Sequence, residues 1–448
     1  MRERELVAQR RSWRGLGPDL LAVFSGAALV LAAALAGWRL IHEHVSIVLG
    51  FPPLLAHWMP HVGPGTAPAI LTAAVVVAYA PGLATRLPWR TLLAAAYVTS
   101  VAWTLFLALV DGWTRGIAHR LYGTGEFLPD IPRVHSIPVM LRQFSTHILT
   151  NQPHHWIPQV GAHPPGAFLG FLWLDRIGLG GGGPAGLACI LIGASAGIAV
   201  TLTLRELGAE TAARAVLPFC VLFPGAVWVG VSADGLFAGV LAWGVALLAV
   251  GAAGRGWRRD LAALAGGLLL GYALYLSYGM VAAGLLPAAV VAVTRAWRAV
   301  LAAALGAAAV VAAFTASGFW WLTGYRLTTV IYAWSVARTR PYTYFVWADL
   351  AALLFVVGPA TLAGLRRLVA HPRAWPAVVG LLTGAALIAV VASDLSGLSK
   401  GEVERIWLPF AVWLLVPCAL LPPRSVRGWL CLQALLALLV NHLLLTVW

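Results

Sequence analysis

Apolar stretches of about 17 to 24 residues follow one another through the chain almost without pause. A helix of that length crosses about 30 Å of hydrocarbon, so each stretch predicts a membrane-spanning helix. The chain has 448 residues, of which 60% are hydrophobic and 10% are charged, and its mean hydropathy is +0.85. Such a composition excludes a water-soluble globule and predicts an all-α, polytopic integral membrane protein.

The apolar pattern predicts about thirteen spans. They are residues 19–41, 67–84, 91–110, 184–204, 211–230, 235–252, 259–277, 280–294, 298–318, 345–364, 375–393, 405–421 and 428–447. We divide the chain into a tail (1–18), two N-terminal spans (19–90), a transmembrane catalytic domain (91–421) and a last span (422–448). The catalytic domain contains two long loops, 112–183 and 319–344, which are predicted to lie on one side of the membrane.

The distribution of basic residues gives the orientation. Five arginines precede the first span, and most later arginines fall in short loops on the same side of the membrane. Basic residues concentrate on the cytoplasmic side, so we expect a multi-pass protein of the cell (plasma) membrane with a cytoplasmic N-terminus. The net charge of +14 comes from scattered loops and not from a basic face with aromatic residues, so no nucleic-acid partner is expected.

The acidic residues favour the opposite, outer side. Of sixteen acids, ten lie outside or at the outer ends of spans: Glu43, Asp111, Glu126, Asp130, Asp175, Asp234, Asp349, Asp394, Glu402 and Glu404. The same loops hold six of the twelve histidines, with several tryptophans and arginines, whereas the cytoplasmic loops are short and plain. Ionisable residues are scarce in such a chain, so we expect an active site on the outer face.

Asp111 stands where the apolar run 91–110 stops. A helix C-terminus disfavours an anion, and a buried, unpaired carboxylate is costly, so Asp111 either faces water as a boundary residue or has a chemical role. In the loop that follows, 111–121 and 139–150 are predicted to be short helices. A third, 166–174, begins after Pro164 and Pro165 and is expected to lie in the outer interface.

Several short motifs follow one another in a fixed order. They are Asp111, then Gly125-Glu126-Phe127-Leu128-Pro129, then His163-Pro164-Pro165, and near the C-terminus Glu404-Arg405-Ile406-Trp407-Leu408-Pro409. This order resembles that of lipid-linked-sugar glycosyltransferases of the GT-C fold, such as protein O-mannosyltransferases and bacterial aminoarabinose transferases, over roughly residues 91–421. Many of those relatives have two adjacent acids where this chain has Asp111-Gly112, and their catalytic helix is usually the first. The missing second acid leaves the need for a divalent metal open.

The resemblance implies a GT-C-like fold and transfer of a sugar from a polyprenyl-phosphate donor to a hydroxyl of a lipid, glycan or protein acceptor, among membrane lipids. Such a transfer needs a base for the hydroxyl and cations for the leaving phosphate. Asp111 is the candidate general base. The candidate phosphate-binding residues are Arg405, Lys400, Arg340, Arg338 and His163. Glu126, Glu404 and Asp394 are expected to support them.

Plainer interpretations stand beside these expectations. Arg405 at the start of a span is placed as an arginine that anchors a helix in the interface would be. The prolines alone account for the local structure at His163, and Asp234 fits a tight outer turn. The alternative function is that of a transporter or a flippase for a lipid-linked substrate. That class places charges near the middle of the membrane and often has internal repeats, and neither is visible in this sequence.

Overall fold

The computed structural model describes residues 15–123 and 125–446, so residues 1–14 of the predicted cytoplasmic tail lie outside the described residues. The longer helices are α2 (Leu16–His42), α3 (Thr66–Arg86), α4 (Trp89–Ala108), α8 (Gly182–Ala194), α9 (Ala196–Glu206), α10 (Glu210–Val221), α12 (Ala233–Ala252), α13 (Trp257–Leu274), α14 (Leu285–Thr294), α15 (Trp297–Ala316), α16 (Trp321–Trp334), α17 (Tyr342–Val357), α18 (Pro359–Ala370), α19 (Ala377–Leu395) and α22 (Val426–Leu443). Shorter helices are α5 (Ile137–Gln143), α6 (Pro158–Ala162), α7 (Pro165–Leu174), α11 (Ala226–Val229), α20 (Val403–Ile406) and α21 (Leu408–Ala411).

In the described residues, eight helices are long and apolar enough to cross a membrane, or nine if α17 and α18 form one bent span. The expectation of a helical, multi-pass membrane protein is therefore confirmed, but the count of thirteen is not. The predicted span 345–364 bends by 106° where Pro359 begins α18. The predicted span 211–230 is divided after Val221, just before Pro224 and Gly225. Proline cannot continue the helical hydrogen-bond pattern, so a continuous apolar run becomes two helices.

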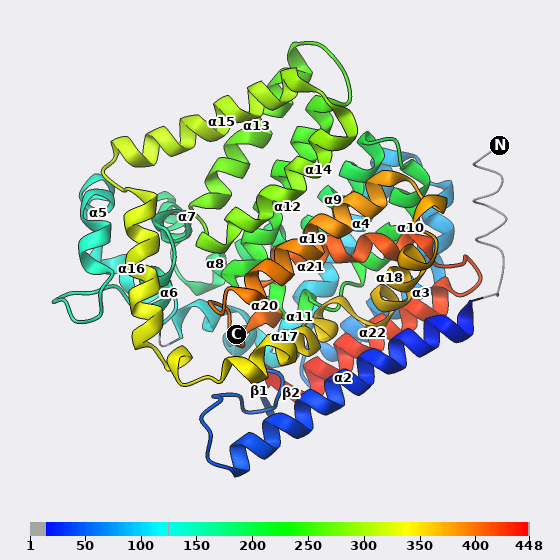
Figure 1. Ribbon diagram of the computed structural model, residues 1–448, viewed down its shortest axis with the longest axis horizontal. Helices are drawn as coiled ribbons and strands as arrows, with labels where there is room; N and C mark the ends of the chain where they lie inside the picture. The colour runs from blue at the N-terminus through cyan, green and yellow to red at the C-terminus, as the bar shows by residue number, and fades with distance from the viewer. Residues whose placement is uncertain (1–14, 124, 447–448) are drawn as a thin grey trace.

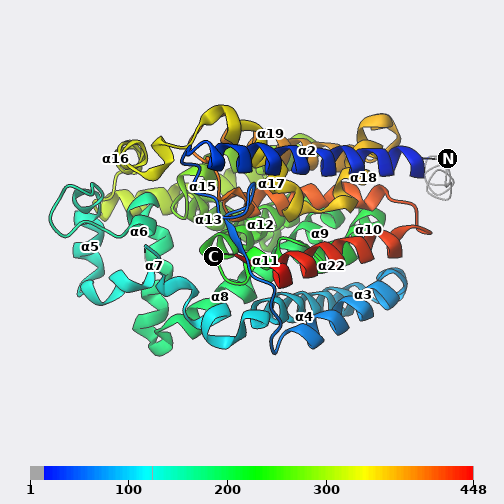
Figure 2. The ribbon, with the colours of Figure 1, turned by 90° about the horizontal axis from the view of Figure 1, so that it is seen from below.

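The long helices lie side by side in one bundle, with α2 along one edge and α3 and α4 along the opposite edge (Figure 2). Helices α5, α6, α7 and α16 gather at one end of this bundle, far from the start of α2 (Figure 1). These four helices belong to the two loops that the sequence predicts to share one side of the membrane. The loop 112–183 contains helices as expected, and α7 begins at Pro165 as predicted. The loop 319–344 is mostly the helix α16, which the sequence analysis missed.

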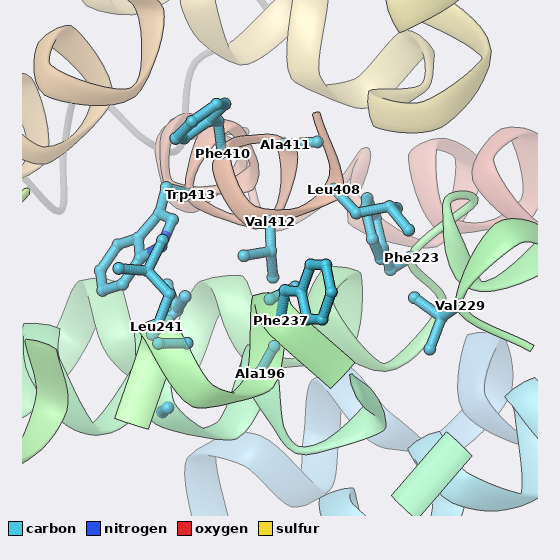
Figure 3. Packing of buried hydrophobic residues seen from close by; sticks show 14 of the residues in the cluster. Ala196, Phe223, Val229, Phe237, Leu241, Leu408, Phe410, Ala411, Val412 and Trp413 are labelled. Carbon is cyan, nitrogen blue, oxygen red and sulfur yellow. The ribbon is translucent and has the colours of Figure 1, made fainter. Parts of the chain in front are cut away.

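Helix α12 lies at the centre of the bundle and positions the candidate site. Phe237 and Leu241 of α12 lie below Val412 and Trp413, which belong to the 3-10 stretch (Val412–Leu420) that continues α21 (Figure 3). All four side chains are buried. Close packing of this kind fixes the distance between two helices, because cores have little empty space. The N-terminus of α12 is thereby held beside α20, which carries Arg405.

The all-α expectation needs one correction. Strand β1 (Ala56–Trp58) pairs antiparallel with β2 (Leu444–Thr446), so the last predicted span ends at Leu443 instead of residue 447. Each strand has three residues, which is too short to produce an alternating pattern. The pairing joins the loop after α2 to the end of the chain.

Candidate functional site

A cavity of about 620 Å³ opens at the end of the bundle where α6, α16 and the end of α19 meet. Its polar wall includes Arg340 and Arg405, each only 5% exposed. Its edge includes Val281 and Leu398, which are 58% and 40% exposed. The cavity therefore joins buried positive charge to an apolar, accessible rim.

Asp234 enters this cavity from the first turn of α12. Ser232 caps that helix, because its side-chain oxygen accepts a hydrogen bond from the backbone N–H of Gly235 at 3.2 Å. A carboxylate is favoured at a helix N-terminus, where the backbone N–H groups and the helix dipole are positive. The local sequence thus both starts the helix and holds an acid at the cavity wall.

Four charged side chains form a continuous row along the wall, which we term the charged row: Asp234, Arg405, Glu402 and Arg340. Arg405 Nη1 lies 2.7 Å from Asp234 Oδ2, and Arg405 Nη2 lies 3.1 Å from Glu402 Oε2. The other oxygen of Glu402, Oε1, lies 3.2 Å from Arg340 Nη2. Acid and base alternate, so each buried guanidinium has a carboxylate partner, as burial requires.

Lys400 adds a third cation to the two arginines. Its Nζ donates to the backbone oxygen of Arg340 at 3.0 Å, and Arg340 Nη1 donates to the backbone oxygen of Lys400 at 2.6 Å. Burial and the neighbouring Arg340 lower the pKa of Lys400. Asp349 holds the segment that contains Lys400, because its carboxylate oxygens accept hydrogen bonds from the backbone N–H of Gly401 at 3.1 and 3.2 Å. Three of the predicted phosphate-binding residues, Arg340, Lys400 and Arg405, are thus brought together.

His163 also lines the cavity, at the junction of α6 and α7. Its Nδ1 lies 2.7 Å from the backbone oxygen of Gln159, which can only accept, so Nδ1 carries a proton. The ring lies between Phe127 and Phe237, with centroid distances of 5.5 and 5.8 Å. Burial lowers the pKa of His163, so the neutral form has Nε2 as a hydrogen-bond acceptor.

Glu126 is half-buried and lies within electrostatic range of the charged row. Burial raises the pKa of Glu126 to about 7, while the nearby charge of Arg405 opposes the rise and that of Asp234 adds to it. The preceding residue, Gly125, accepts a hydrogen bond from the backbone N–H of Gln159 at 2.8 Å, which fastens this turn to α6. With this pKa, the protonation of the Glu126 carboxyl changes near neutral pH.

Asp111 lies outside the cavity lining, in a separate cluster that we term the Asp111 cluster. Its Oδ1 lies 2.9 Å from Arg115 and 3.1 Å from His61 Nε2, and its Oδ2 lies 3.0 Å from Arg120. Arg120 also donates to the backbone oxygen of Thr446 at 2.8 Å, which ties the cluster to strand β2. Electrostatic interactions of Glu126 with both Arg120 and Arg405 connect the Asp111 cluster to the cavity.

The remaining predicted site residues do not line the cavity. Arg338 is exposed, although Ala337 beside it lines the wall. Glu404 is fully buried, and its Oε1 accepts from the backbone N–H of Leu55 at 3.0 Å, so it supports the loop after α2. Asp394 is buried near the end of α19, within electrostatic range of Asp349.

The sequence analysis missed the roles of Asp234 and Asp349. Asp234 was interpreted as part of a turn, yet it pairs with an arginine 171 positions away in the chain. The available signal was its place, two residues after Ser232 at the start of an apolar run and on the predicted outer side. Asp349 lies inside the run 345–364, and a carboxylate inside such a run is a sign of a buried partner.

In residues 15–123 and 125–446, no group of three or more His, Cys, Asp or Glu side chains is arranged to hold a metal ion. Comparison of the chain with protein-family models, with curated proteins and with solved structures finds no match. The cavity and its charges are therefore the basis for the function proposed below.

Proposed function

We propose that this protein is a membrane glycosyltransferase, which moves a sugar from a polyprenyl-phosphate donor to an acceptor hydroxyl on a lipid, glycan or protein. The observation that carries the proposal is the cavity, in which Arg340, Arg405 and Lys400 converge behind an exposed apolar edge. Guanidinium groups suit a phosphate, and an apolar edge suits a prenyl chain that stays in the membrane. The volume of about 620 Å³ is in the range of small-molecule sites.

In the proposed reaction, the acceptor hydroxyl gives its proton to a carboxylate and its oxygen attacks the anomeric carbon. The bond from that carbon to the phosphate oxygen breaks, and the polyprenyl phosphate leaves with the bonding electrons. Arg405 and Arg340, with Lys400, are proposed to stabilise the charge on the leaving phosphate. Asp111 is the proposed base, as the resemblance implies, and Asp234 is the alternative that the cavity offers.

For Asp111 to accept a proton, an acceptor must reach a carboxylate that Arg115, Arg120 and His61 now surround. Arg115 is half-exposed, whereas the other two side chains are nearly buried, so Arg115 has the most room to move aside. His163 Nε2 is proposed to accept a hydrogen bond from the sugar. Glu126, Glu404 and Asp394 are proposed to hold these groups in place, and a divalent metal is not required by the steps above.

The proposal includes the finer topology: a GT-C-like bundle with about thirteen crossings, in which the divided apolar segments also cross. It places the protein in the plasma membrane with the N-terminus in the cytoplasm and the cavity on the outer face. The support is the clustering of short, arginine-rich loops on the side opposite the acids.

The test is incubation of the purified protein with radiolabelled polyprenyl-phosphate sugars and a membrane extract, followed by measurement of label in lipid, glycan and protein fractions. We expect transfer by the wild type and by Arg424→Ala, because Arg424 is exposed and does not line the cavity. Label that remains entirely on the donor would contradict the proposal.

The alternative, a transporter or flippase for a lipid-linked substrate, has one observation in its favour. Transporters use discontinuous helices at their binding sites, and α17 and α18 meet at a bend of 106°. Proteoliposomes that contain a fluorescent polyprenyl-phosphate sugar and an acceptor extract separate the two functions. A flippase moves the lipid between leaflets with its bonds unchanged, whereas a transferase breaks the sugar–phosphate bond.

A further inference from the structure

Glu402 bridges the two most buried cations of the cavity. One carboxylate oxygen lies 3.1 Å from Arg405 Nη2, and the other lies 3.2 Å from Arg340 Nη2. Paired oxygens between two guanidinium groups are also the arrangement that a phosphate makes with two arginines. Glu402 therefore presents to this clamp the chemistry that a phosphate group would present.

Glu402 is also the member of the charged row with the most freedom to leave. Its side chain is 22% exposed, against 7% for Arg405 and 5% for both Asp234 and Arg340. Arg405 has a second carboxylate partner, Asp234, at 2.7 Å. Departure of Glu402 thus frees donors on both arginines and does not leave Arg405 without a carboxylate.

The backbone conformation also favours movement of Glu402. Glu402 has a φ of +65°, in the left-handed region that a residue with a long side chain seldom adopts. Gly401 before it has a φ of +77°, and Gly397 at the start of the loop has a φ of +66°. The loop is therefore bounded by positions with wide backbone freedom, and Glu402 is held in an unfavourable conformation by its contacts.

We infer that Glu402 occupies the place at which a ligand phosphate binds, and that the phosphate displaces it from Arg340 and Arg405. With Glu402 in place the charged row holds two acids and two bases, so it is electrically balanced. When Glu402 turns to water, the clamp gains a net positive charge, beside Lys400, for the incoming anion. Glu402 would then exclude weak anions and admit a phosphate that brings further contacts. That the phosphate is part of a lipid-linked sugar donor rests on the proposed function.

The test measures the affinity of detergent-purified protein for decaprenyl monophosphate, for decaprenol and for inorganic phosphate. Glu402→Gln keeps the shape of the side chain and removes its charge. We expect this variant to bind decaprenyl monophosphate about tenfold more tightly. A gain of that size follows if Glu402 blocks the two arginines about nine-tenths of the time in the wild type. Glu402→Asn should behave alike and tolerates the left-handed backbone better, so it secures the test if the glutamine variant folds poorly. Glu43→Gln is the matched control, because Glu43 pairs with Arg39 at 2.7 Å in an exposed site outside the cavity lining, and it should leave affinity unchanged.

Tighter binding of decaprenyl monophosphate by both variants, with no change for decaprenol, supports the inference. An unchanged or weaker affinity, or an equal gain for decaprenol, overturns it. Competition by inorganic phosphate distinguishes the source of the anion. If inorganic phosphate competes with decaprenyl monophosphate only at far higher concentration, the clamp binds a lipid headgroup. If the two compete with equal potency, the clamp binds a free anion. Binding needs no turnover. Tighter binding by the variants without any sugar transfer therefore supports the phosphate clamp and rejects the transferase. Sugar transfer without tighter binding by the variants supports the transferase and rejects the inference about Glu402.

Discussion

The Asp111 cluster and the charged row use the same side chains in two different settings. In each, a buried carboxylate contacts arginines at about hydrogen-bond distance. The Asp111 cluster is closed, because Arg120 continues to the backbone of Thr446 and Asp111 has three cationic or histidine neighbours. The charged row is open, because it lines a cavity of about 620 Å³ and ends on the half-exposed loop with Lys400.

The position of an acid in the sequence does not tell whether its side chain faces a cavity. Asp111 follows an apolar run and Asp234 precedes one, and both belong to the predicted outer side. Whether such an acid faces a substrate depends on what packs over it. We propose that the charged row binds the donor and that Asp111 accepts the proton. The following experiments test that division.

The largest effect is expected in a labelling test of which side of the membrane each region faces, because a position is either labelled or not. Single cysteines at Asn151 or Ser396 should react with an impermeant thiol reagent on intact cells, and those at Arg255 or Ala370 should not. All four positions are exposed. Glycine positions with a positive φ, such as Gly125 and Gly256, are avoided because cysteine would be strained there.

The background for this labelling is Cys431→Ser, since Cys431 is exposed and the other three cysteines are buried. Labelling at Arg255 from outside the cell, before permeabilisation, would place the two regions in the cytoplasm and remove the basis for an outer active site.

The next largest effect is expected at Asp111. Asp111→Asn keeps the shape of the side chain and loses its basicity, so turnover should fall about a hundredfold or more. Donor affinity should change by less than about twofold, because Asp111 does not line the cavity. Initial rates of label transfer at saturating donor, together with donor binding, separate the two quantities.

Asp234→Asn is the companion variant, and it should weaken donor binding more than Asp111→Asn because it removes the carboxylate that lies 2.7 Å from Arg405 and positions its guanidinium. If Asp111→Asn turns over normally and Asp234→Asn does not, the roles are reversed. Asp111 is then a structural residue, and Asp234 is the base.

Four of the candidate residues chosen from the sequence line the cavity, and they could be chosen because hydropathy and charge sidedness are local signals. Arg340, Lys400, Arg405 and His163 line one cavity although they come from distant segments. The pairing of Asp234 with Arg405 was not predictable, since a single sequence carries no signal for a contact over 171 positions. Arg338 is two residues from Arg340, yet a 3-10 turn leaves it exposed.

The same reasoning explains the outcome for the fold. Hydropathy measures how long an apolar run is and not whether the helix is continuous. The run 405–421 is thus divided among α20, α21 and a 3-10 stretch that contains Pro417. The pairing of β1 with β2 depends on backbone hydrogen bonds between residues 56–58 and 444–446, which side-chain patterns of three residues cannot encode.

A smaller but clear effect is expected for Arg405→Lys. Arg405 contacts Asp234 and Glu402 through two different nitrogens, and an ammonium group cannot reproduce that planar geometry. We expect donor affinity to fall about ten- to a hundredfold, with a lower melting temperature, because breaking a buried ion pair is costly. Arg424→Lys is the control on an exposed residue and should be silent. Wild-type binding by Arg405→Lys would leave Arg405 as a helix anchor and separate it from the phosphate.

The smallest effect concerns Glu126, which joins the two regions electrostatically. The pKa of Glu126 is about 7, so the carboxyl is mostly protonated and neutral below pH 7 and mostly ionised above it. An ionised Glu126 attracts Arg405 and repels an incoming anion, so donor affinity should fall several-fold as the pH rises from about 6 to about 8. Glu126→Gln stays neutral throughout and should hold the high affinity at both pH values. A pH dependence that is identical in the two proteins would mean that another group titrates, and that Glu126 does not couple the Asp111 cluster to the cavity.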